Sequence, residues 1–318
     1  MDQLIAQATE FLKGKIRRTP IEYSQELSQL LGHPTYLKLE SLQLTGSFKI
    51  RGGFYYLSTL SAEERKRGVA ACSAGNHGLG IAYAAKELNI PCTVYVPKSV
   101  DQAKYDKLLK LGAKVKKSEF IGYDDTLEWT IQEAAKEKLV LVTAFNDEKI
   151  MASNGGTIAV EVLEDLPEAT HFILPMGGGG LPAGFSWYVK SKNPKAHVTV
   201  CQLAECPAFK LSLEQNKPIT RMPPVETLAG GIEGGLGDKC FEVLKTRIDE
   251  IALIKEEELK AAVCWFLEHH QYLIEPSAAV ALASCLFGHV KPKGPTVIVL
   301  SGRNVSYATI RQLVCGNK

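Results

Sequence analysis

The sequence has no closely spaced pair of cysteines, no long apolar run and almost no excess of charge. Its eight cysteines are scattered, mostly through apolar segments, and none of them forms a C-x-x-C pair. This spacing indicates neither a disulfide framework nor a zinc ribbon. We therefore expect buried, reduced thiols in a cytoplasmic protein.

No apolar run reaches the roughly 18 residues that a membrane-spanning helix needs. The first residues, MDQLIAQATEFLKGKIRR, carry acids and amides within a helical pattern, so neither export nor membrane insertion is expected. The 37 basic and 35 acidic side chains give a formal net charge of +2. This balance provides no broad positive surface, and we expect neither nucleic acid nor a membrane as a partner.

What the sequence does contain is one repeated pattern: a β-branched apolar run, a glycine-rich loop, a helical segment and a further apolar run. The pattern predicts strands at 69–72, 92–96, 171–175 and near 198–202, and a helix from about 79 to 88. The segment TVIVLSGRNVSYATIRQLV adds a last strand, a turn and a closing helix. Strands that alternate with helices predict an α/β fold of mainly parallel sheets, with ligands at the carboxyl ends of the strands.

The 318 residues suffice for one large or two medium domains. Polar and glycine residues interrupt the pattern near 40–46 and near 144–156. We therefore expect a small domain at 41–144, and a large domain formed by 1–40 together with 145–318.

Four consecutive glycines, Gly177 to Gly180, follow a predicted strand and precede a predicted helix. In this geometry backbone N–H groups and the positive end of the helix bind an anion, most often phosphate. Gly178, Gly180 and Ala183 also satisfy a G-x-G-x-x-A dinucleotide pattern, with Glu205 as a ribose partner. The loop alone leaves a tight turn, a dinucleotide site and a phosphate site open.

The segment SAGNHG, residues 73–78, places polar side chains at the end of another strand. Asn76 could cap the following helix or hold a polar ring or carboxylate against the open backbone of Ala74 and Gly75. His77 fits a polar wall better than a catalytic base.

Lys49 stands between a Thr-Gly-Ser turn and an apolar helix start. A lysine on a solvated helix face would be ordinary. A lysine that reacts with a carbonyl must instead be held rigidly and kept from strong ion pairing, so that its amine can be neutral. The flanking Phe48 and Ile50 fit this need, and Arg51 points elsewhere if the segment is helical.

Five segments carry a resemblance when they are taken in order: SFKIRGG, SAGNHG, GGGGLPAG, IEPSAA and SGRN. From about residue 15 to about residue 312, the sequence resembles the pyridoxal-phosphate enzymes of the serine/threonine dehydratase family, which includes serine racemase. The resemblance implies fold type II, as in the tryptophan synthase β subunit, with two domains. It also implies a homodimer or homotetramer that acts on a small amino acid.

The resemblance further implies the role of each site residue. Lys49 would be the covalent anchor of pyridoxal 5'-phosphate and later the base. Phe48 would lie near the cofactor ring, Asn76 at its 3-hydroxyl and Ser301 at its pyridine nitrogen. The remaining assignments are the phosphate loop Gly177, Gly178, Gly179 and Gly180, a further cofactor residue Glu275, and the substrate-binding and catalytic segment Ser73, Ala74, Gly75, Asn76 and His77.

Several positions depart from the family pattern. Ala74 stands where the racemases of the family carry a serine, which favours elimination over racemisation. Arg303 replaces the usual glycine or alanine, and the added cation could favour an acidic substrate side chain. MASNGGT is one residue longer than the usual IAGQGT.

The metal site of some relatives is matched only by Glu205, because CPAFKL lacks the second carboxylate. A monovalent or divalent cation therefore remains open. The chain also ends soon after the last motif, so we expect no C-terminal regulatory domain.

The main hypothesis is an ammonia-lyase that converts L-threonine or L-serine into a 2-oxo acid and ammonia. Serine racemase and 3-hydroxyaspartate dehydratase are the enzymatic alternatives. A nucleotide-binding regulatory protein without catalysis is the third.

Overall fold

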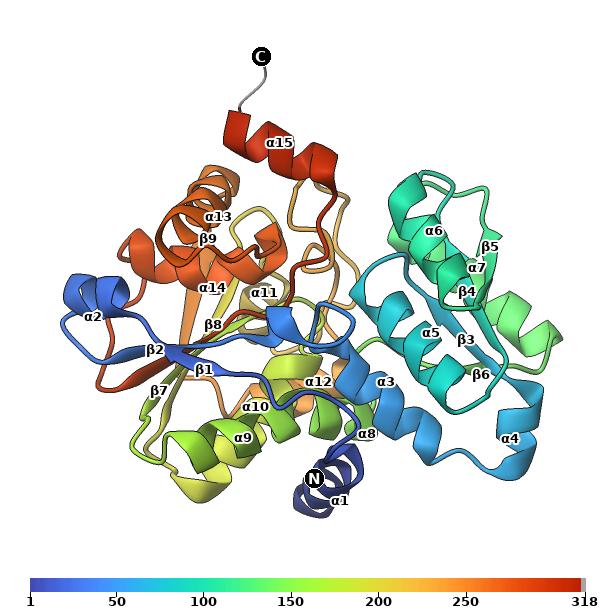
Figure 1. The fold of residues 1–318 in the computed structure, drawn as a ribbon, viewed down its shortest axis with the longest axis horizontal. Coiled ribbons are helices and arrows are strands. Elements are labelled where there is room, and N and C mark those ends of the chain that lie inside the picture. The colour runs from blue at the N-terminus through green and yellow to red at the C-terminus, as the bar shows by residue number, and fades with distance from the viewer. Residues whose placement is uncertain (316–318) are drawn as a thin grey trace.

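The structure is a computed structural model that describes residues 1–315, and it contains two β-sheets flanked by helices (Figure 1). The larger sheet has six strands in the order β1-β2-β10-β7-β8-β9, and only its β1–β2 pair is antiparallel. Its strands are β1 (Ile21–Tyr23), β2 (Thr35–Lys38), β7 (His171–Pro175), β8 (His197–Leu203), β9 (Glu250–Ile254) and β10 (Thr296–Val299).

The smaller sheet has four parallel strands in the order β5-β4-β3-β6. They are β3 (Val69–Cys72), β4 (Cys92–Val96), β5 (Lys114–Lys117) and β6 (Val140–Leu141). These strands come from one continuous stretch of the chain, whereas the larger sheet combines strands from before and after it. The division into domains at 40/41 and 144/145 stays a prediction, and its final residues 316–318 lie outside the described part of the chain.

Helices cover both faces of each sheet (Figure 1). Along β7, Phe172 and Leu174 pack with α9 (Thr157–Asp165) and α10 (Gly180–Lys192). Ile173 packs on the opposite face with α13 (Glu256–His270) and α14 (Pro276–Leu286), as strand alternation requires. The helices are α1 (Asp2–Leu12), α2 (Gln25–Leu31), α3 (Lys49–Ser58), α4 (Ala62–Arg67), α5 (Asn76–Glu87), α6 (Gln102–Lys110), α7 (Tyr123–Lys136), α8 (Glu148–Met151), α9 (Thr157–Asp165), α10 (Gly180–Lys192), α11 (Ala208–Glu214), α12 (Asp238–Leu244), α13 (Glu256–His270), α14 (Pro276–Leu286) and α15 (Tyr307–Cys315), with a 3₁₀ turn at Glu40–Leu42. Within residues 1–315, none of these helices is both long and apolar enough to cross a membrane.

The predicted α/β fold with mainly parallel sheets is confirmed, and the strands predicted at 69–72, 92–96 and 171–175 have these bounds. The helix predicted from about residue 79 begins earlier, at Asn76. Asn76, His77 and Gly78 form its first turn, so only residues 73–75 separate the helix from β3. The backbone N–H groups of this first turn therefore point toward the end of the strand.

The MASNGGT segment has an unusual local structure, and its lengthening relative to the family pattern stays a prediction. Residues Ala152–Gly156 form a π-helical turn between α8 and α9. Such turns accommodate a single additional residue inside a helix. The turn directs the side chain of Asn154 at α3, where its Oδ1 accepts a 2.8 Å hydrogen bond from the backbone N–H of Gly52.

Candidate active site

Lys49 is the first residue of α3, and its side chain is partly buried. Its Nζ donates a 2.8 Å hydrogen bond to the main-chain oxygen of Ala144 and lies 5.2 Å from the centre of the Phe48 ring. No ion pair to Lys49 is found among residues 1–315. Burial lowers the pKa of Lys49 to about 8, although Cys240 and Glu275 oppose the shift. The neutral amine, which a nucleophilic lysine requires, therefore becomes available near pH 8 and not only above pH 10.

Arg51 points away from Lys49, as predicted, and is fully buried. Its guanidinium lies 2.8 Å from Oε1 of Glu40 and 2.7 Å from Oε1 of Glu161. Lys38 adds a 2.5 Å ion pair to Oε2 of Glu161. These four charges, which we call the buried charge quartet, hold the first turn of α3 against β2 and α9.

A close helix crossing brings α5 beside α3. At Gly80 an added Cβ would lie 3.0 Å from the backbone of Lys49 and Ile50, and at Gly53 it would lie 3.1 Å from the backbone oxygen of Gly80. Glycine at both positions permits this approach. The N-terminal turn of α5 is thereby held next to the lysine.

The four glycines connect the end of β7 to α10, with Gly179 in the left-handed conformation at φ +95°. A Cβ on Gly178 would overlap the ring of Phe145, and one on Gly180 would lie 2.9 Å from Cβ of Phe145. Gly178 itself does not have positive φ, so a side chain there is excluded by Phe145 and not by backbone strain. Phe145 directly follows Ala144, the acceptor of Lys49. The lysine and the glycine loop are thus neighbours.

Asn76 does not cap α5, so the capping alternative is wrong. Gly75 occupies the N-cap position, and no side chain caps the helix there. The Asn76 amide instead donates to Oε1 of Glu275 at 2.6 Å and accepts from Nδ2 of Asn304 at 2.7 Å. Asn304 also donates to the main-chain oxygen of Thr45. This asparagine–glutamate network joins four segments that are far apart in the sequence.

Ser301 and Gly302 follow β10 and border the same network. The backbone oxygen of Ser301 accepts from the N–H of Phe48, and the oxygen of Gly302 accepts from the N–H of Glu275. A Cβ on Gly302 would overlap the carboxylate of Glu275. Burial raises the pKa of this carboxyl group, while its hydrogen bond from Asn76 opposes the shift.

The segment from Ser73 to His77 lies at the carboxyl end of β3, as predicted. Ser73 Oγ accepts a 3.1 Å hydrogen bond from the N–H of Gly75, so this hydroxyl shapes the turn. A ring nitrogen of His77 lies 2.9 Å from the oxygen of Val142. Burial, and secondarily the charge of Lys49, lowers the pKa of His77 to about 3. His77 is therefore neutral at physiological pH, and its role as a polar wall stays a prediction.

Three buried hydroxyls in the segment that leads to Lys49, those of Ser41, Thr45 and Ser47, have no hydrogen-bond partner among the described residues. Unpaired buried hydroxyls are uncommon and indicate a missing polar partner. A phosphate-bearing aldehyde fits the groups of the site: an amine with a lowered pKa, a glycine loop at the start of a 13-residue helix, and an amide at Asn76. The residues present therefore fit pyridoxal phosphate.

Glu205 is exposed and follows the end of β8. Within residues 1–315 it belongs to no group of three closely spaced histidine, cysteine or carboxylate ligands. Its role as a metal ligand stays a prediction.

Four residues that contact the site are not among the residues predicted from the sequence: Ala144, Phe145, Asn154 and Asn304. Asn304 ends the SGRN motif, and its place in that motif was the available signal. The other three lie in the polar stretch 144–156, which was interpreted only as a break in the pattern.

Comparison with known proteins agrees with this geometry. A family model described as pyridoxal-phosphate dependent enzyme matches residues 12–302. An L-threonine ammonia-lyase of Thermotoga maritima is 39% identical over 312 residues, which cover 98% of this chain and 77% of that protein.

Two solved structures are similar over most of their length. Maize serine racemase has a TM-score of 0.92 at 26% identity, with 98% of this chain and 95% of that chain covered. The processed form of threonine deaminase isoform 2 from Solanum lycopersicum has a TM-score of 0.89 at 28% identity, with 98% and 87% covered. Sequence motifs, fold and site geometry thus agree, and the chain belongs to the pyridoxal-phosphate dependent enzymes of the serine/threonine dehydratase family.

Proposed function

We propose that this enzyme is an ammonia-lyase that converts L-threonine, L-serine or both into the 2-oxo acid and ammonia by β-elimination. The observation that carries the proposal is Lys49, which has a lowered pKa and no carboxylate partner among residues 1–315, next to the glycine loop. Relatives named as threonine ammonia-lyases or dehydratases, 31–39% identical to this chain, support the same reaction.

Different residues of the site are assigned to the phosphate, the ring and the substrate carboxylate. The glycine loop and the start of α10 would bind the phosphate, and Asn76 would hydrogen-bond the ring. Pyridoxal phosphate, when bound, supplies the electron sink that stabilises negative charge at the substrate α-carbon. Ser301 is a neutral partner for the ring nitrogen and would not hold a proton there as a carboxylate does. The N-terminal turn of α5 and the backbone of Ser73 to Gly75 bind the substrate carboxylate.

Lys49 moves the proton. With the amino acid held in the site, the Nζ of Lys49 would accept the proton from the substrate α-carbon. The β-hydroxyl would then leave as water, carrying the proton that the Nζ of Lys49 had taken up. The released enamine is hydrolysed to the 2-oxo acid and ammonia. Ala74 supplies no second acid or base on the opposite face, which favours elimination over racemisation.

A substrate panel tests the proposal. L- and D-forms of serine, threonine and 3-hydroxyaspartate are incubated with the holoenzyme, and 2-oxo acid formation is measured. We expect turnover of L-threonine or L-serine, and its abolition in Lys49→Ala with the fold retained. If Lys49→Ala kept a tenth of the turnover, the activation free energy would have risen by only about 1.4 kcal/mol. Such a small effect would show that Lys49 has no essential role in the mechanism.

The non-enzymatic alternative, a nucleotide-binding regulatory protein, has a separate test. A lysine-bound cofactor makes the purified protein yellow, and borohydride traps it on Lys49. A colourless protein that is not labelled by pyridoxal phosphate and borohydride would favour the alternative.

A second candidate substrate is 3-hydroxyaspartate. The backbone N–H of Arg303 donates to the oxygen of Gly46, in the turn that precedes Lys49. Its guanidinium forms no ion pair with any residue from 1 to 315. A cation near the site that has no carboxylate partner favours a substrate whose side chain carries a carboxylate. Arg303→Ala should then lower turnover of hydroxyaspartate more than that of threonine.

We further propose a cytoplasmic homodimer or homotetramer with activity toward serine as well as threonine. The eight cysteines, none of them in a disulfide, support a reducing compartment, and the assembly follows from the family resemblance. A monovalent or divalent cation at Glu205 is part of the same proposal. Light scattering and activity assays in chelator-treated buffers test these points.

A further inference from the structure

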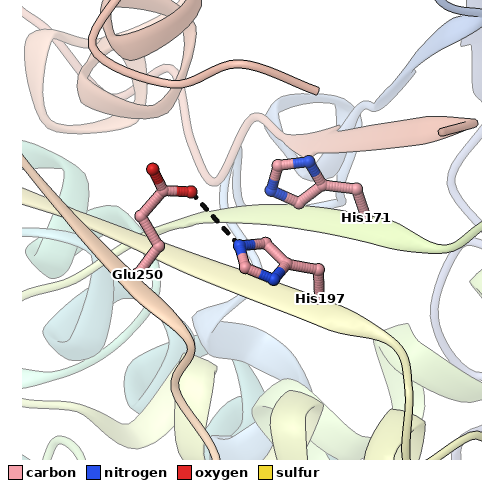
Figure 2. Close-up of side chains that lie close together, drawn as sticks. All are labelled: His171, His197 and Glu250. Carbon is pink, nitrogen blue, oxygen red and sulfur yellow. Dashed lines mark hydrogen bonds and ion pairs between the residues drawn. The ribbon is translucent and has the colours of Figure 1, made fainter. Parts of the chain in front are cut away.

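Three potential metal ligands lie together at the amino ends of three neighbouring strands, on the edge of the sheet opposite the glycine loop. They are His171 on β7, His197 on β8 and Glu250 on β9, and one ligand atom of each lies within 4.8 Å of the others (Figure 2). Within residues 1–315 this is the only such group. We call it the His-His-Glu cluster, and the proposed reaction makes no use of it.

The strand register places these side chains on one face of the sheet. His171 pairs with His197 across β7 and β8, and Thr199 pairs with Glu250 across β8 and β9. His197 and Thr199 are two residues apart on the same strand, so their side chains share a face. The positions of the ligand atoms are thus set by backbone pairing in a rigid sheet and not by a flexible loop.

We propose that the His-His-Glu cluster binds a divalent transition-metal ion of the zinc class. Two imidazole nitrogens and one carboxylate oxygen form a ligand set that zinc uses when a fourth position is left to water. Imidazole ligands select zinc, copper, nickel or cobalt over magnesium and calcium, which prefer all-oxygen sites. The ion would tie β7, β8 and β9 together at one end.

Burial and orientation fit a metal site. His171 is fully buried, and the side chains of His197 and Glu250 are 16% and 31% exposed, which leaves an entry path from solvent. The two imidazole rings meet edge to face with their centres 4.7 Å apart. His197 Nε2 lies 3.2 Å from Oε2 of Glu250, as the dashed line in Figure 2 marks.

Without an ion, hydrogen bonds occupy the same atoms. The backbone N–H of Lys293 donates to Nδ1 of His171, which leaves the ring proton on Nε2, 2.8 Å from the hydroxyl of Thr199. Thr199 in turn donates to Oε2 of Glu250 at 3.0 Å. This chain links Nε2 of His171 to the Glu250 carboxylate through the Thr199 hydroxyl, and it also holds a proton on the atom that would bind the ion.

Metal binding at Nε2 therefore moves the ring proton to Nδ1 and opens the 3.2 Å hydrogen bond from Lys293. Lys293 is exposed and lies in the loop before β10, so loss of this bond removes no hydrogen bond between strands. Three metal–ligand bonds replace the hydrogen bonds of the cluster. Because the ligands must be deprotonated, binding should weaken in acid.

The test is calorimetric titration of the holoenzyme with zinc chloride in a non-chelating buffer, without substrate. We expect one zinc ion per chain and a rise in the thermal midpoint. His197→Gln and Glu250→Gln should each weaken binding by roughly tenfold or more and abolish the rise. Both keep a polar side chain of similar size, and circular dichroism checks that they fold.

The matched control is His289→Gln. His289 lies 2.7 Å from Glu258 in a second histidine–carboxylate pair, but no third ligand accompanies it among the described residues. This variant should bind zinc as the wild type does. Turnover should be unchanged in all three variants, because the cluster lies at the opposite ends of the strands from the glycine loop.

The absorption spectrum of bound cobalt(II) distinguishes metal binding by the His-His-Glu cluster from metal binding by cysteine thiolates. Cobalt(II) bound by nitrogen and oxygen ligands gives a visible absorption band without the near-ultraviolet band of a thiolate complex. The proposal would be overturned if the wild type bound no stoichiometric zinc, or if His197→Gln bound zinc as well as the wild type. A thiolate band that persists in His197→Gln and Glu250→Gln would overturn it as well.

Discussion

The side-chain amine of Lys49 donates its hydrogen bond to the main-chain oxygen of Ala144, 2.8 Å away, and not to a carboxylate. A carbonyl oxygen orients the amine without the full charge that would keep it protonated. The one carboxylate that acts on it electrostatically, Glu275, has a raised pKa of its own. Contact with Ala144 therefore positions the nucleophile while burial makes it available.

The pKa of Lys49 predicts how fast the apoenzyme captures pyridoxal phosphate. Burial lowers this pKa from the ordinary 10.5 to about 8, so the reactive neutral amine accumulates with rising pH and dominates above about 8. The rate of covalent capture should rise about tenfold per pH unit below 8 and then level off. Stopped-flow absorbance measures it.

A free lysine derivative in the same buffers is the control, and its capture rate should keep rising toward about pH 10. If the protein's rate also climbs steeply between about pH 9 and 10, the amine of Lys49 is not shifted.

The geometry of the glycine loop predicts that an added methyl group lowers the affinity for the cofactor. Gly178→Ala places a Cβ against the ring of Phe145, and Gly179→Ala places one at φ +95°, 2.8 Å from Cβ of Cys240. Both should lower the affinity for pyridoxal phosphate by roughly tenfold or more, because the loop must shift from its anion-binding geometry. Equilibrium binding followed by cofactor absorbance measures the loss.

Gly230→Ala is the matched control for the loop. Gly230 is exposed, its φ is not positive, and an added Cβ would have no neighbour within 4 Å. Its affinity should equal that of wild type. Unchanged affinity in Gly178→Ala would contradict the assignment of this loop to the phosphate.

The buried charge quartet predicts a large stability loss when one cation is removed. Arg51→Met leaves the carboxylates of Glu40 and Glu161 buried with only Lys38 to balance them. Breaking a buried ion pair on one side typically costs about 3–5 kcal/mol in the free energy of unfolding. Urea denaturation of the apoenzyme measures the difference from wild type.

Arg18→Met provides the comparison. Arg18 also pairs with two carboxylates, Glu164 and Asp165, but its side chain is 49% exposed. Exposed pairs contribute about 1 kcal/mol or less. Equal losses in Arg18→Met and Arg51→Met would mean that burial of the quartet contributes nothing to stability.

The strands were the most predictable elements, since runs such as VAAC and HFILP are buried along their whole length between two layers of helices. Their carboxyl ends identified the loops of the site, and Lys49 was recognisable from its turn and its apolar neighbours. The start of α5 was placed too late because Asn76, His77 and Gly78 are weak helix formers.

Contacts between distant segments could not be predicted from the sequence. Lys49 and Ala144 are 95 residues apart, and Gly52 and Asn154 are 102 apart. Neither Ala144 nor Asn154 has a local pattern that marks a partner. The full burial of Lys38 could not be predicted from the sequence either, because it depends on Glu161 in α9, more than 100 residues later in the chain.

Ala74 predicts the stereochemical outcome of the reaction. It lines a small cavity of about 20 Å³ together with Gly75, Leu79 and Asn304, which is room for one hydroxyl. The neighbouring hydroxyl of Ser73 accepts from the N–H of Gly75, so it shapes the turn. A carbanion that is protonated only by Lys49 returns to its starting configuration.

Wild type should therefore form 2-oxo acid from L-serine with little D-serine, whereas Ala74→Ser should raise racemisation relative to elimination. The new hydroxyl can act only within hydrogen-bond reach of the proton's path, roughly 2.6–3.2 Å. Ala74→Cys, which adds a side chain of similar size with a different proton affinity, separates acid–base function from a change of shape. Chiral chromatography with a parallel 2-oxo acid assay measures both products. Substantial D-serine from the wild-type enzyme would overturn the preference for a dehydratase, whatever the variants do.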